Sequence, residues 1–315
     1  MRRLSNVIVL FLALALVILV LCFVTSSSND KLDIKWSSEG EWIVFSCGDF
    51  PLSHPRSSLY IMRPDGGEIQ KITPDNLIAT YPVWTAKGDW IAFLSENTIF
   101  KMKPDGTDIE KILGLLPPQK IESIDWSPDG KWIAYTVSDI TGGSLQQISS
   151  DGTENFSILS HGKIFNKVKW SPDGKSMAYF YVTSSTASSG VYIVNVNDKK
   201  TKEVLDYGAI MSPLDWSPDG KELILTIFEN QQPHLYRLDL QSNQLVLVSV
   251  KYFASSPTWS PNSEWISFSG YRENQENWSQ IYKSRVDGSE QQRLTDMTDC
   301  NATAPQWFDF RLSKS

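Results

Sequence analysis

The chain has 315 residues, of which 41% are hydrophobic and 21% charged, a composition typical of a folded globular protein. Its formal net charge is -7, and it carries twelve Trp and sixteen Pro but only three His. An acidic chain without a basic stripe is a poor partner for a phosphate backbone, so the composition argues against nucleic-acid binding. Many Trp and Pro residues favour short strands joined by tight turns.

The N-terminus carries an export signal. Arg2 and Arg3 precede an unbroken apolar run from Val7 to Val24, and a polar segment follows. Eighteen apolar residues at about 1.5 Å each span about 27 Å, which exceeds a signal-peptide core and nearly covers a bilayer. We expect residues 1–29 to form an uncleaved membrane anchor, with a signal peptide cut near Ser26 as the alternative. The basic flank stays in the cytoplasm, so the rest of the chain is exported in both cases.

A unit of 42 to 48 residues then recurs six times. Each unit opens with Trp, continues through a turn such as Ser-Pro-Asp-Gly, and enters an apolar run such as Trp-Ile-Ala-Phe. Its second half has two further apolar runs around a turn such as Asp65-Gly66, so each unit is predicted to be two hairpins, or four strands. The leading residues are Trp36, Trp84, Trp126, Trp170, Trp216 and Trp259, and a seventh, Trp307, begins only a stub. Sheets of this period cannot bury both faces alone, so they pack radially and close into a ring.

The chemistry of the turn explains the motif without a ligand. In the turn from Ser127 to Gly130, Pro presets φ for the second position and Gly accepts the left-handed conformation that a bulged hairpin loop requires. Gly recurs in the first five units, but Ser263 replaces it in the sixth, where we expect a strained or differently shaped turn. We interpret the Asp as a turn former and not a metal ligand, and each leading Trp as core between neighbouring blades.

The run from Trp126 to Tyr135, followed by an apolar strand and an Asp-Gly turn, resembles the WD40-like repeat of the TolB-type propellers. The resemblance covers nearly all of residues 30–310. It implies an all-β fold, a six-bladed β-propeller of four-stranded antiparallel blades over residues 30–315. Family members include periplasmic scaffolds and the propeller domains of some exported peptidases. TolB itself has an additional α/β domain before its propeller, whereas these repeats begin within a few residues of the apolar segment, so TolB's role in an envelope complex is not carried over.

The ends of the repeat region are expected to meet. We predict that a strand containing Trp307 and Phe310 joins the N-terminal blade, and the alternative is a seven-bladed ring in which the terminal segments share a blade. Cys47 follows the second strand of unit one and Cys300 precedes the closing strand, so we predict a disulfide between them, with two unrelated buried thiols as the alternative. Cys22 follows a Leu and not the small residue of a lipoprotein signal, so lipidation is not expected.

No catalytic motif is visible. The chain contains no Gly-x-Ser-x-Gly nucleophile elbow, no His-Glu-x-x-His zinc helix and no phosphate-binding Gly-rich loop before a helix. His54, His161 and His234 fall in links of different units, so we expect no metal and no cofactor. We favour a non-catalytic module that binds a protein, peptide or glycan. The alternative is a propeller enzyme of the lyase or cyclase type with its site in the central channel.

The connections between strands predict where binding occurs. Short Pro-Asp-Gly and Asp-Gly turns share one face of the ring, here called the turn face. Longer links emerge on the opposite face, here called the loop face, over residues 46–58, 136–143, 182–190, 228–234 and 270–279. Loops on a rigid scaffold are where recognition usually resides. The candidate binding residues on the loop face are Tyr81, Phe165, Tyr207, Tyr252, Phe253, Tyr271, Arg272 and Trp278. The other interpretation is that these rings pack their own loops or cap the core.

Overall fold

The computed structural model describes residues 40–48, 57–161, 164–182, 189–206, 210–229, 232–271 and 278–310. The N-terminal segment expected at residues 1–29, and with it the boundary of the predicted propeller domain, lies outside the described residues. Within the described part, the chain has no helix with the length and apolar character needed to span a bilayer.

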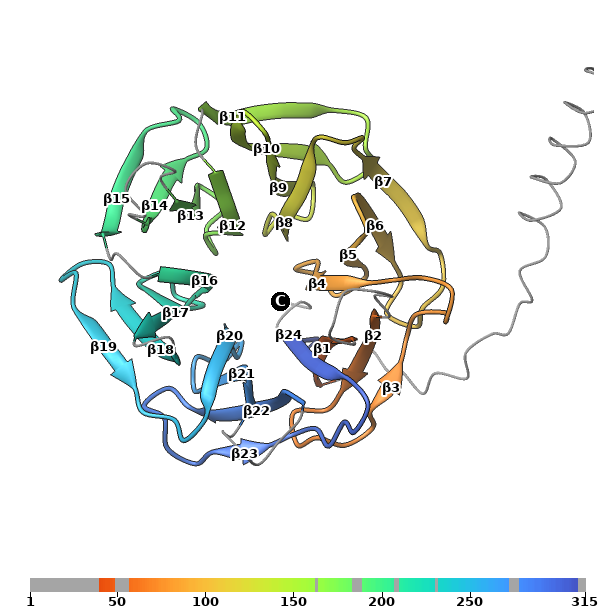
Figure 1. The fold of residues 1–315 in the computed structure, drawn as a ribbon, viewed down its shortest axis with the longest axis vertical. Coiled ribbons are helices and arrows are strands. Elements are labelled where there is room, and N and C mark those ends of the chain that lie inside the picture. Colours follow the sequence, from red (N-terminus) through yellow and green to blue (C-terminus); the bar gives the residue numbers. More distant parts are fainter. Residues whose placement is uncertain are drawn as a thin grey trace, which may run out of the picture. The chain divides into compact units, whose positions relative to one another are not determined.

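The described residues form 24 strands in six antiparallel sheets of four, arranged around a central axis (Figure 1). Each sheet is one blade, and its first strand in the following list lies innermost. Blade 1 contains β24 (Asn301–Asp309), β1 (Glu41–Gly48), β2 (Ser57–Met62) and β3 (Gln70–Lys71). Blade 2 contains β4 (Thr80–Trp84), β5 (Ile91–Ser95), β6 (Thr98–Met102) and β7 (Glu110–Gly114). Blade 3 contains β8 (Lys120–Trp126), β9 (Trp132–Asp139), β10 (Gly142–Ser149) and β11 (Asn155–His161).

The remaining three blades repeat this order. Blade 4 contains β12 (Ile164–Trp170), β13 (Ser176–Val182), β14 (Ser189–Asn195) and β15 (Thr201–Asp206). Blade 5 contains β16 (Ile210–Trp216), β17 (Glu222–Glu229), β18 (Gln232–Asp239) and β19 (Leu245–Val248). Blade 6 contains β20 (Phe253–Trp259), β21 (Trp265–Tyr271), β22 (Gln280–Arg285) and β23 (Gln292–Arg293). The six-bladed, four-stranded architecture is therefore confirmed, and the seven-bladed alternative is wrong.

The ring closes through the last strand. β24 pairs antiparallel with β1, so that Trp307 lies opposite Ile43 and the innermost strand of the first blade comes from the end of the chain. Cys47 and Cys300 form a disulfide with their Cα atoms 5.5 Å apart, at the loop-face end of this pair of strands. At the other end, the N–H of Phe310 donates to the carbonyl of Gly40 over 3.0 Å. The closure predicted from Trp307 is confirmed, and the cysteines singled out by the sequence are joined.

The core lies mainly between neighbouring blades. The leading Trp side chains are at most 9% exposed, and they are Trp84, Trp126, Trp170, Trp216, Trp259 and Trp307. Trp84 of blade 2, for example, stacks on Phe308 of blade 1 with ring centroids 5.4 Å apart. A large ring in this position buries much apolar area at a junction where two sheets meet. The interpretation of these Trp residues as core is confirmed.

The tight turns have the predicted chemistry. Asp129 Oδ1 accepts hydrogen bonds from Ser127 Oγ at 2.6 Å and from the N–H of Lys131 at 3.1 Å, so this carboxylate is held by its own turn. Gly130 has φ of +69°. Ser263 adopts the same left-handed conformation with φ of +62°, and its N–H donates to Ser260 O at 3.0 Å. The sixth turn therefore keeps the common shape with a residue that is strained in it.

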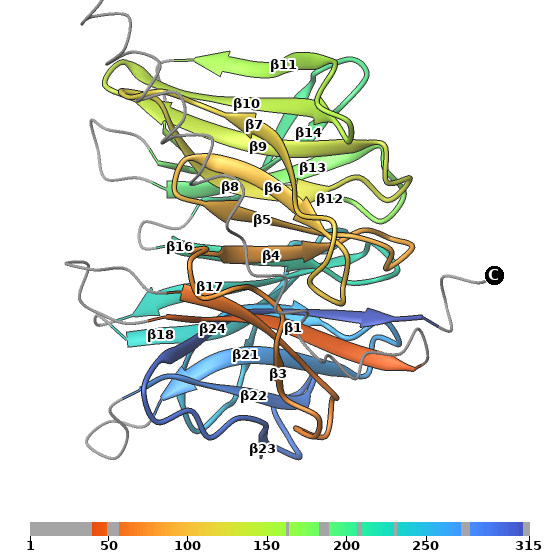
Figure 2. The same cartoon turned by 90° about the vertical axis from the view of Figure 1, so that its right-hand side faces the viewer.

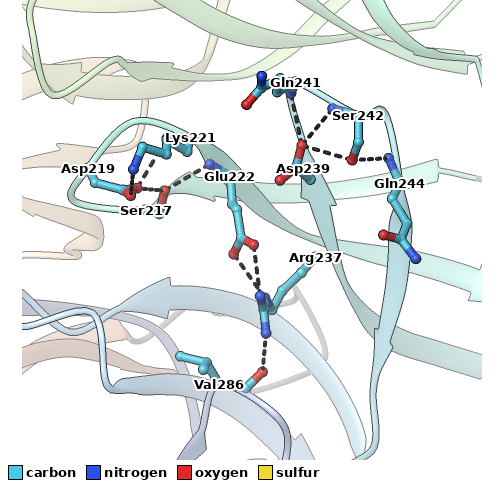
Figure 3. A network of polar contacts seen from close by, with 10 residues as sticks. All are labelled: Ser217, Asp219, Lys221, Glu222, Arg237, Asp239, Gln241, Ser242, Gln244 and Val286. Atoms are coloured by element: carbon cyan, nitrogen blue, oxygen red, sulfur yellow. Dashed lines mark hydrogen bonds and ion pairs between the residues drawn. The ribbon is translucent and has the colours of Figure 1, made fainter.

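Blade 5 replaces an aromatic contact by an ion pair (Figure 3). In blades 1 and 6 the second Trp of the motif lies beneath a cation, with Arg63 3.8 Å from the Trp42 ring centroid and Arg285 over Trp265. The corresponding residue of blade 5 is Glu222, which binds Arg237 through two contacts of 2.8 and 2.9 Å. Arg237 also reaches the carbonyl of Val286 in blade 6 at 3.4 Å, so this ion pair joins two blades.

The strands of each blade run between the turn face and the loop face (Figure 2). The links between first and second and between third and fourth strands lie on the turn face, as predicted. Two loop-face links are shorter than expected. Pairing between β9 and β10 continues to Asp139 and Gly142, which leaves only two residues between these strands. Pairing between β17 and β18 likewise continues to Glu229 and Gln232. The expectation of long loops over 136–143 and 228–234 was wrong, because continuous antiparallel pairing extends these strands.

Candidate functional site

The inner strands of all six blades surround a central channel. Repeat symmetry brings the same positions of the motif to the axis, because each inner strand contributes residues that lie one to three places before its leading Trp. The cavity is lined by residues 81–83 of β4, 123–124 of β8, 167–169 of β12, 214 of β16, 256–257 of β20 and 304–306 of β24. Segments far apart in the sequence thus share one cavity.

The inner strands carry β-bulges at these positions. The register of β4 shifts between Thr80 and Val83, and β12 and β20 shift at the equivalent place. Four residues here have left-handed φ values of +51° to +55°, namely Tyr81, Lys167, Ser256 and Ala304. None is glycine, so each conformation costs on the order of 1 kcal/mol or more. Bulges re-aim side chains, and strain that recurs where the blades converge marks this part of the channel as a candidate site.

A charged layer crosses the channel one residue before the leading Trp. Lys169 Nζ donates to Asp125 Oδ1 of blade 3 at 3.0 Å and to Gln306 Oε1 of blade 1 at 2.9 Å. Blades 1 and 4 lie on opposite sides of the ring (Figure 1), so Lys169 reaches across the channel. Burial alone would lower the pKa of Lys169, but the opposing charges of Asp125 and Asp215 raise it above its ordinary value, and the side chain stays cationic at neutral pH.

The carboxylates of this layer also tie each blade to the next. Asp125 Oδ2 accepts from the N–H of Trp170 at 2.8 Å. Asp215 Oδ2 accepts from Thr258 Oγ1 at 2.8 Å and from the N–H of Trp259 at 2.9 Å. Both aspartates therefore satisfy a backbone donor in the following blade, which is a structural use of a buried carboxylate.

A second group lies nearer the loop face, where the inner strands begin. Lys167 Nζ lies 3.7 Å from the ring centroid of Tyr81, and a pocket beside the channel is lined by both residues together with Glu96, Lys120 and Glu122. Glu122 accepts from Ser138 Oγ at 2.6 Å and from Lys120 Nζ at 2.9 Å. We call Tyr81, Lys167, Lys120 and Glu122 the channel-mouth cluster.

Lys167 has an unusual electrostatic position in this cluster. Burial lowers the pKa of Lys167, and the nearby Tyr81 and Glu122 oppose the shift without reversing it. In the part of the chain that the structure describes, Lys167 forms no salt bridge, whereas Glu122 is paired with Lys120. The side chains of residues 164–166, which precede Lys167 on β12, lie outside the described residues.

The predicted loop-face aromatics have different environments. Tyr81 lies on β4 and belongs to the channel-mouth cluster. Phe253 and Tyr271 pair across β20 and β21 with ring centroids 5.3 Å apart, and neither lines the two cavities above. Tyr252 stacks on Tyr282 with ring centroids 3.9 Å apart, so it packs on the core of its own blade.

The structure describes the other predicted residues only in part. Phe165 lies on β12 with its side chain outside the described set, and Tyr207 and Arg272 fall outside the described residues. Trp278 is partly exposed just before β22. The expectation that these aromatics lie in loops was wrong for Tyr81, Phe165, Phe253 and Tyr271, which all lie on strands. The strands reach farther towards the loop face than turn signals indicate, because cross-strand pairing continues through them.

Sequence reasoning missed Lys167, Glu122, Ser256 and Ala304. Lys167, Ser256 and Ala304 each lie three residues before a leading Trp, as Tyr81 does. Aligning the segments before each Trp, instead of treating them as loops, would have placed these residues in one layer. Within the described residues, no three His, Cys, Asp or Glu side chains are placed to share a metal ion.

Comparison with known proteins agrees with this fold. A family model described as the TolB beta propeller domain matches residues 142–309. TolB from Acinetobacter baumannii is similar, with a TM-score of 0.71 and 19% identity over 85% of this chain. The match covers 66% of that TolB chain, which is just under two thirds of its length. A putative TolB from Agrobacterium tumefaciens has a TM-score of 0.66 and 16% identity over 86% of this chain and 99% of that one.

A chain from a Nidogen/Laminin complex gives a TM-score of 0.68 at 9% identity, over 85% of this chain and 98% of that one. Likeness at these identities shows the fold alone. A search of curated protein sequences found no significant match.

Proposed function

Because the chain belongs to the TolB β-propeller family, we propose that it is a non-catalytic scaffold that binds a protein or peptide, or alternatively a glycan, at the loop-face mouth of its central channel. The observation that carries the proposal is the ring of bulged inner strands, in which Tyr81, Lys167, Ser256 and Ala304 hold strained conformations around one cavity. Conformations of this cost persist when the surrounding structure fixes them, and they cluster at sites of recognition.

The contacts of the charged layer support binding over catalysis. Asp125 and Asp215 each accept a backbone N–H from the next blade, and Lys169 bridges Asp125 and Gln306. A general acid or base needs a free lone pair or proton within reach of the substrate. Both oxygens of Asp125 and the ammonium of Lys169 are already bonded between blades. The enzyme alternative, of the lyase or cyclase type, predicts instead that a captured ligand is turned over.

We also place the propeller outside the cytoplasm, held by the segment from Val7 to Val24 or released by cleavage near Ser26. The basic flank of that segment supports this orientation. The bond between Cys47 and Cys300 supports an oxidising compartment. Mass spectrometry of the mature protein distinguishes the two forms, since an N-terminus near Ser27 contradicts the anchor while leaving export intact.

The binding proposal is tested by crosslinking and capture with the full chain. Tyr81→Ala removes an aromatic ring that is 44% exposed at the channel mouth, so the yield of a specific partner should fall. Asp65→Asn changes a turn-face residue and serves as the control. Unfolding midpoints of both variants establish that the ring is intact. Partner yields that are equal for wild type and Tyr81→Ala, or that fall equally in both variants, contradict the assignment to this face.

A further inference from the structure

Two residues connect the central channel with the pocket beside it. The channel is lined by the inner strands of all six blades, and the side pocket lies between blades 2 and 3. Of the residues described, Tyr81 and Lys167 alone line both cavities. A ligand that enters from the loop face therefore meets the Lys167 ammonium and the Tyr81 ring before it reaches the charged layer at Lys169.

Among the described residues, no carboxylate near Lys167 forms a salt bridge with it. The facing groups on neighbouring elements are Glu122 and Lys120 of β8, which pair with each other at 2.9 Å, and the exposed Glu96 between β5 and β6. Glu122 also accepts from Ser138, so both of its oxygens are engaged. A buried cation whose neighbouring carboxylate, Glu122, is salt-bridged to another lysine is costly, and a charge-assisted hydrogen bond to an anionic ligand would lower that cost.

The backbone and the aromatic ring fix the ammonium in place. Lys167 and Tyr81 occupy the same repeat position two blades apart, with φ of +53° and +52°. The Lys167 Nζ atom lies 3.7 Å from the Tyr81 ring centroid, and both side chains line the channel cavity. Ser256 and Ala304 fill the same layer from blades 6 and 1 with small side chains, so space for a ligand group remains. A donor held in this way pays little ordering entropy on binding.

We propose that Lys167, supported by Tyr81, binds a carboxylate of the ligand at the channel mouth. The inference rests on the proposed function and specifies the chemistry of its ligand. The carboxylate belongs to an acidic side chain, to a free peptide C-terminus or to a uronic acid of a glycan, and these sources share the same recognition by a single ammonium. A cationic ligand is disfavoured here because Glu122 is already paired.

The test uses peptides of defined chemistry and the full chain with reductively ¹³C-methylated lysines. The probes are acetyl-Gly-Gly-Gly-Ala with a free C-terminus, the same peptide amidated, acetyl-Gly-Glu-Gly-amide, and a galacturonic acid disaccharide. The Lys167 methyl signal is identified by its loss in Lys167→Met. We expect the carboxylate probes to shift this signal and the amidated alanine peptide to bind at least tenfold more weakly. The probe that binds most tightly identifies the source of the carboxylate.

Two variants control for the cation and its ring. Lys167→Met should weaken the carboxylate probes at least tenfold, and Lys167→Arg should retain much of their binding. Lys103 lies 3.8 Å from the Trp90 ring centroid, the same type of contact away from the channel, so Lys103→Met should leave binding unchanged. Equal binding of the free and amidated alanine peptides, or equal binding by wild type and Lys167→Met, overturns the inference.

The inference and the proposed function fail in different ways. If capture of a partner depends on Tyr81 but is the same in wild type and Lys167→Met, the carboxylate site is wrong and the binding face stands. If capture does not depend on Tyr81, the proposed face itself is wrong.

Discussion

Reduction of the bond between Cys47 and Cys300 should destabilise the propeller strongly, because it closes a loop of 253 residues. In the chain-entropy treatment, a cross-link lowers the entropy of the unfolded chain by about 2.1 + 1.5R ln n cal/mol/K, which for this loop corresponds to about 5.5 kcal/mol at room temperature. The bond also lies at the loop-face end of the β1–β24 pair that closes the ring. Loss of this bond therefore weakens the closing strand and the unfolded-state constraint together.

The assay is urea unfolding followed by tryptophan fluorescence, with the oxidised protein compared with the same protein under a phosphine reductant. Cys22→Ala in both samples prevents disulfide exchange with the third cysteine. The unfolding free energy should fall by several kcal/mol on reduction, and Cys47→Ala/Cys300→Ala should behave like the reduced protein. Cys47 and Cys300 are 4% and 8% exposed, so a small additional loss from the shortened side chains is expected. Coincident unfolding curves for oxidised and reduced protein would refute the reasoning.

Three further predictions concern the turns and the charged layer. Ser263→Gly should stabilise the fold by about 1 kcal/mol by relieving its positive φ, while Gly130→Ser, where an added Cβ meets nothing within 4 Å, should destabilise it by a similar amount; urea midpoints that do not move in opposite directions contradict this. Lys169→Met should cost about 3–5 kcal/mol because Asp125 is left buried and unpaired, and Lys169→Met/Asp125→Leu should recover much of the loss; an additive double variant refutes the pairing. Hydrogen bonds from the hydroxyl and N–H groups of its own turn lower the pKa of Asp151 from 3.8 to about 2. Its contribution to stability is therefore present above about pH 4 and is lost as the pH falls through about 2. Asp151→Asn should flatten the acid limb of a plot of unfolding free energy against pH, and an unchanged limb rejects the assignment.

The fold was predictable because its determinants are local and repeated. The turn from Ser127 to Gly130 specifies a bulged hairpin in four residues, and Trp at a fixed spacing reports the blade period. Closure followed from Trp307, which repeats the leading Trp a seventh time. Each of these signals can be read within about ten residues, and each was repeated often enough to be recognised.

The candidate site depends on contacts that no local pattern contains. Lys169 bonds to Gln306, which is 137 residues away, because a six-bladed ring places blades 1 and 4 on opposite sides of the channel. The left-handed conformations could not be predicted either, because Tyr81 and Lys167 are neither Gly nor Asn, the residue types that normally adopt a positive φ. Their backbone is fixed by bulges in inner strands that must converge around one axis, which is a property of the closed ring.

The two lysines of β12 differ in a way that supports the proposed binding site. Lys167 and Lys169 are two residues apart on one strand and both point towards the axis, yet burial lowers the pKa of Lys167, whereas Asp125 and Asp215 overcome burial and raise the pKa of Lys169. The difference is therefore the supply of carboxylates and not the depth of burial. Lys169 cannot exchange its partners without leaving a buried carboxylate unpaired. Lys167 forms no salt bridge with a carboxylate of the described residues, and Glu122 is paired with Lys120. An anion bound by Lys167 would therefore leave the contacts between blades in place, which supports the proposed site in the layer nearer the loop face.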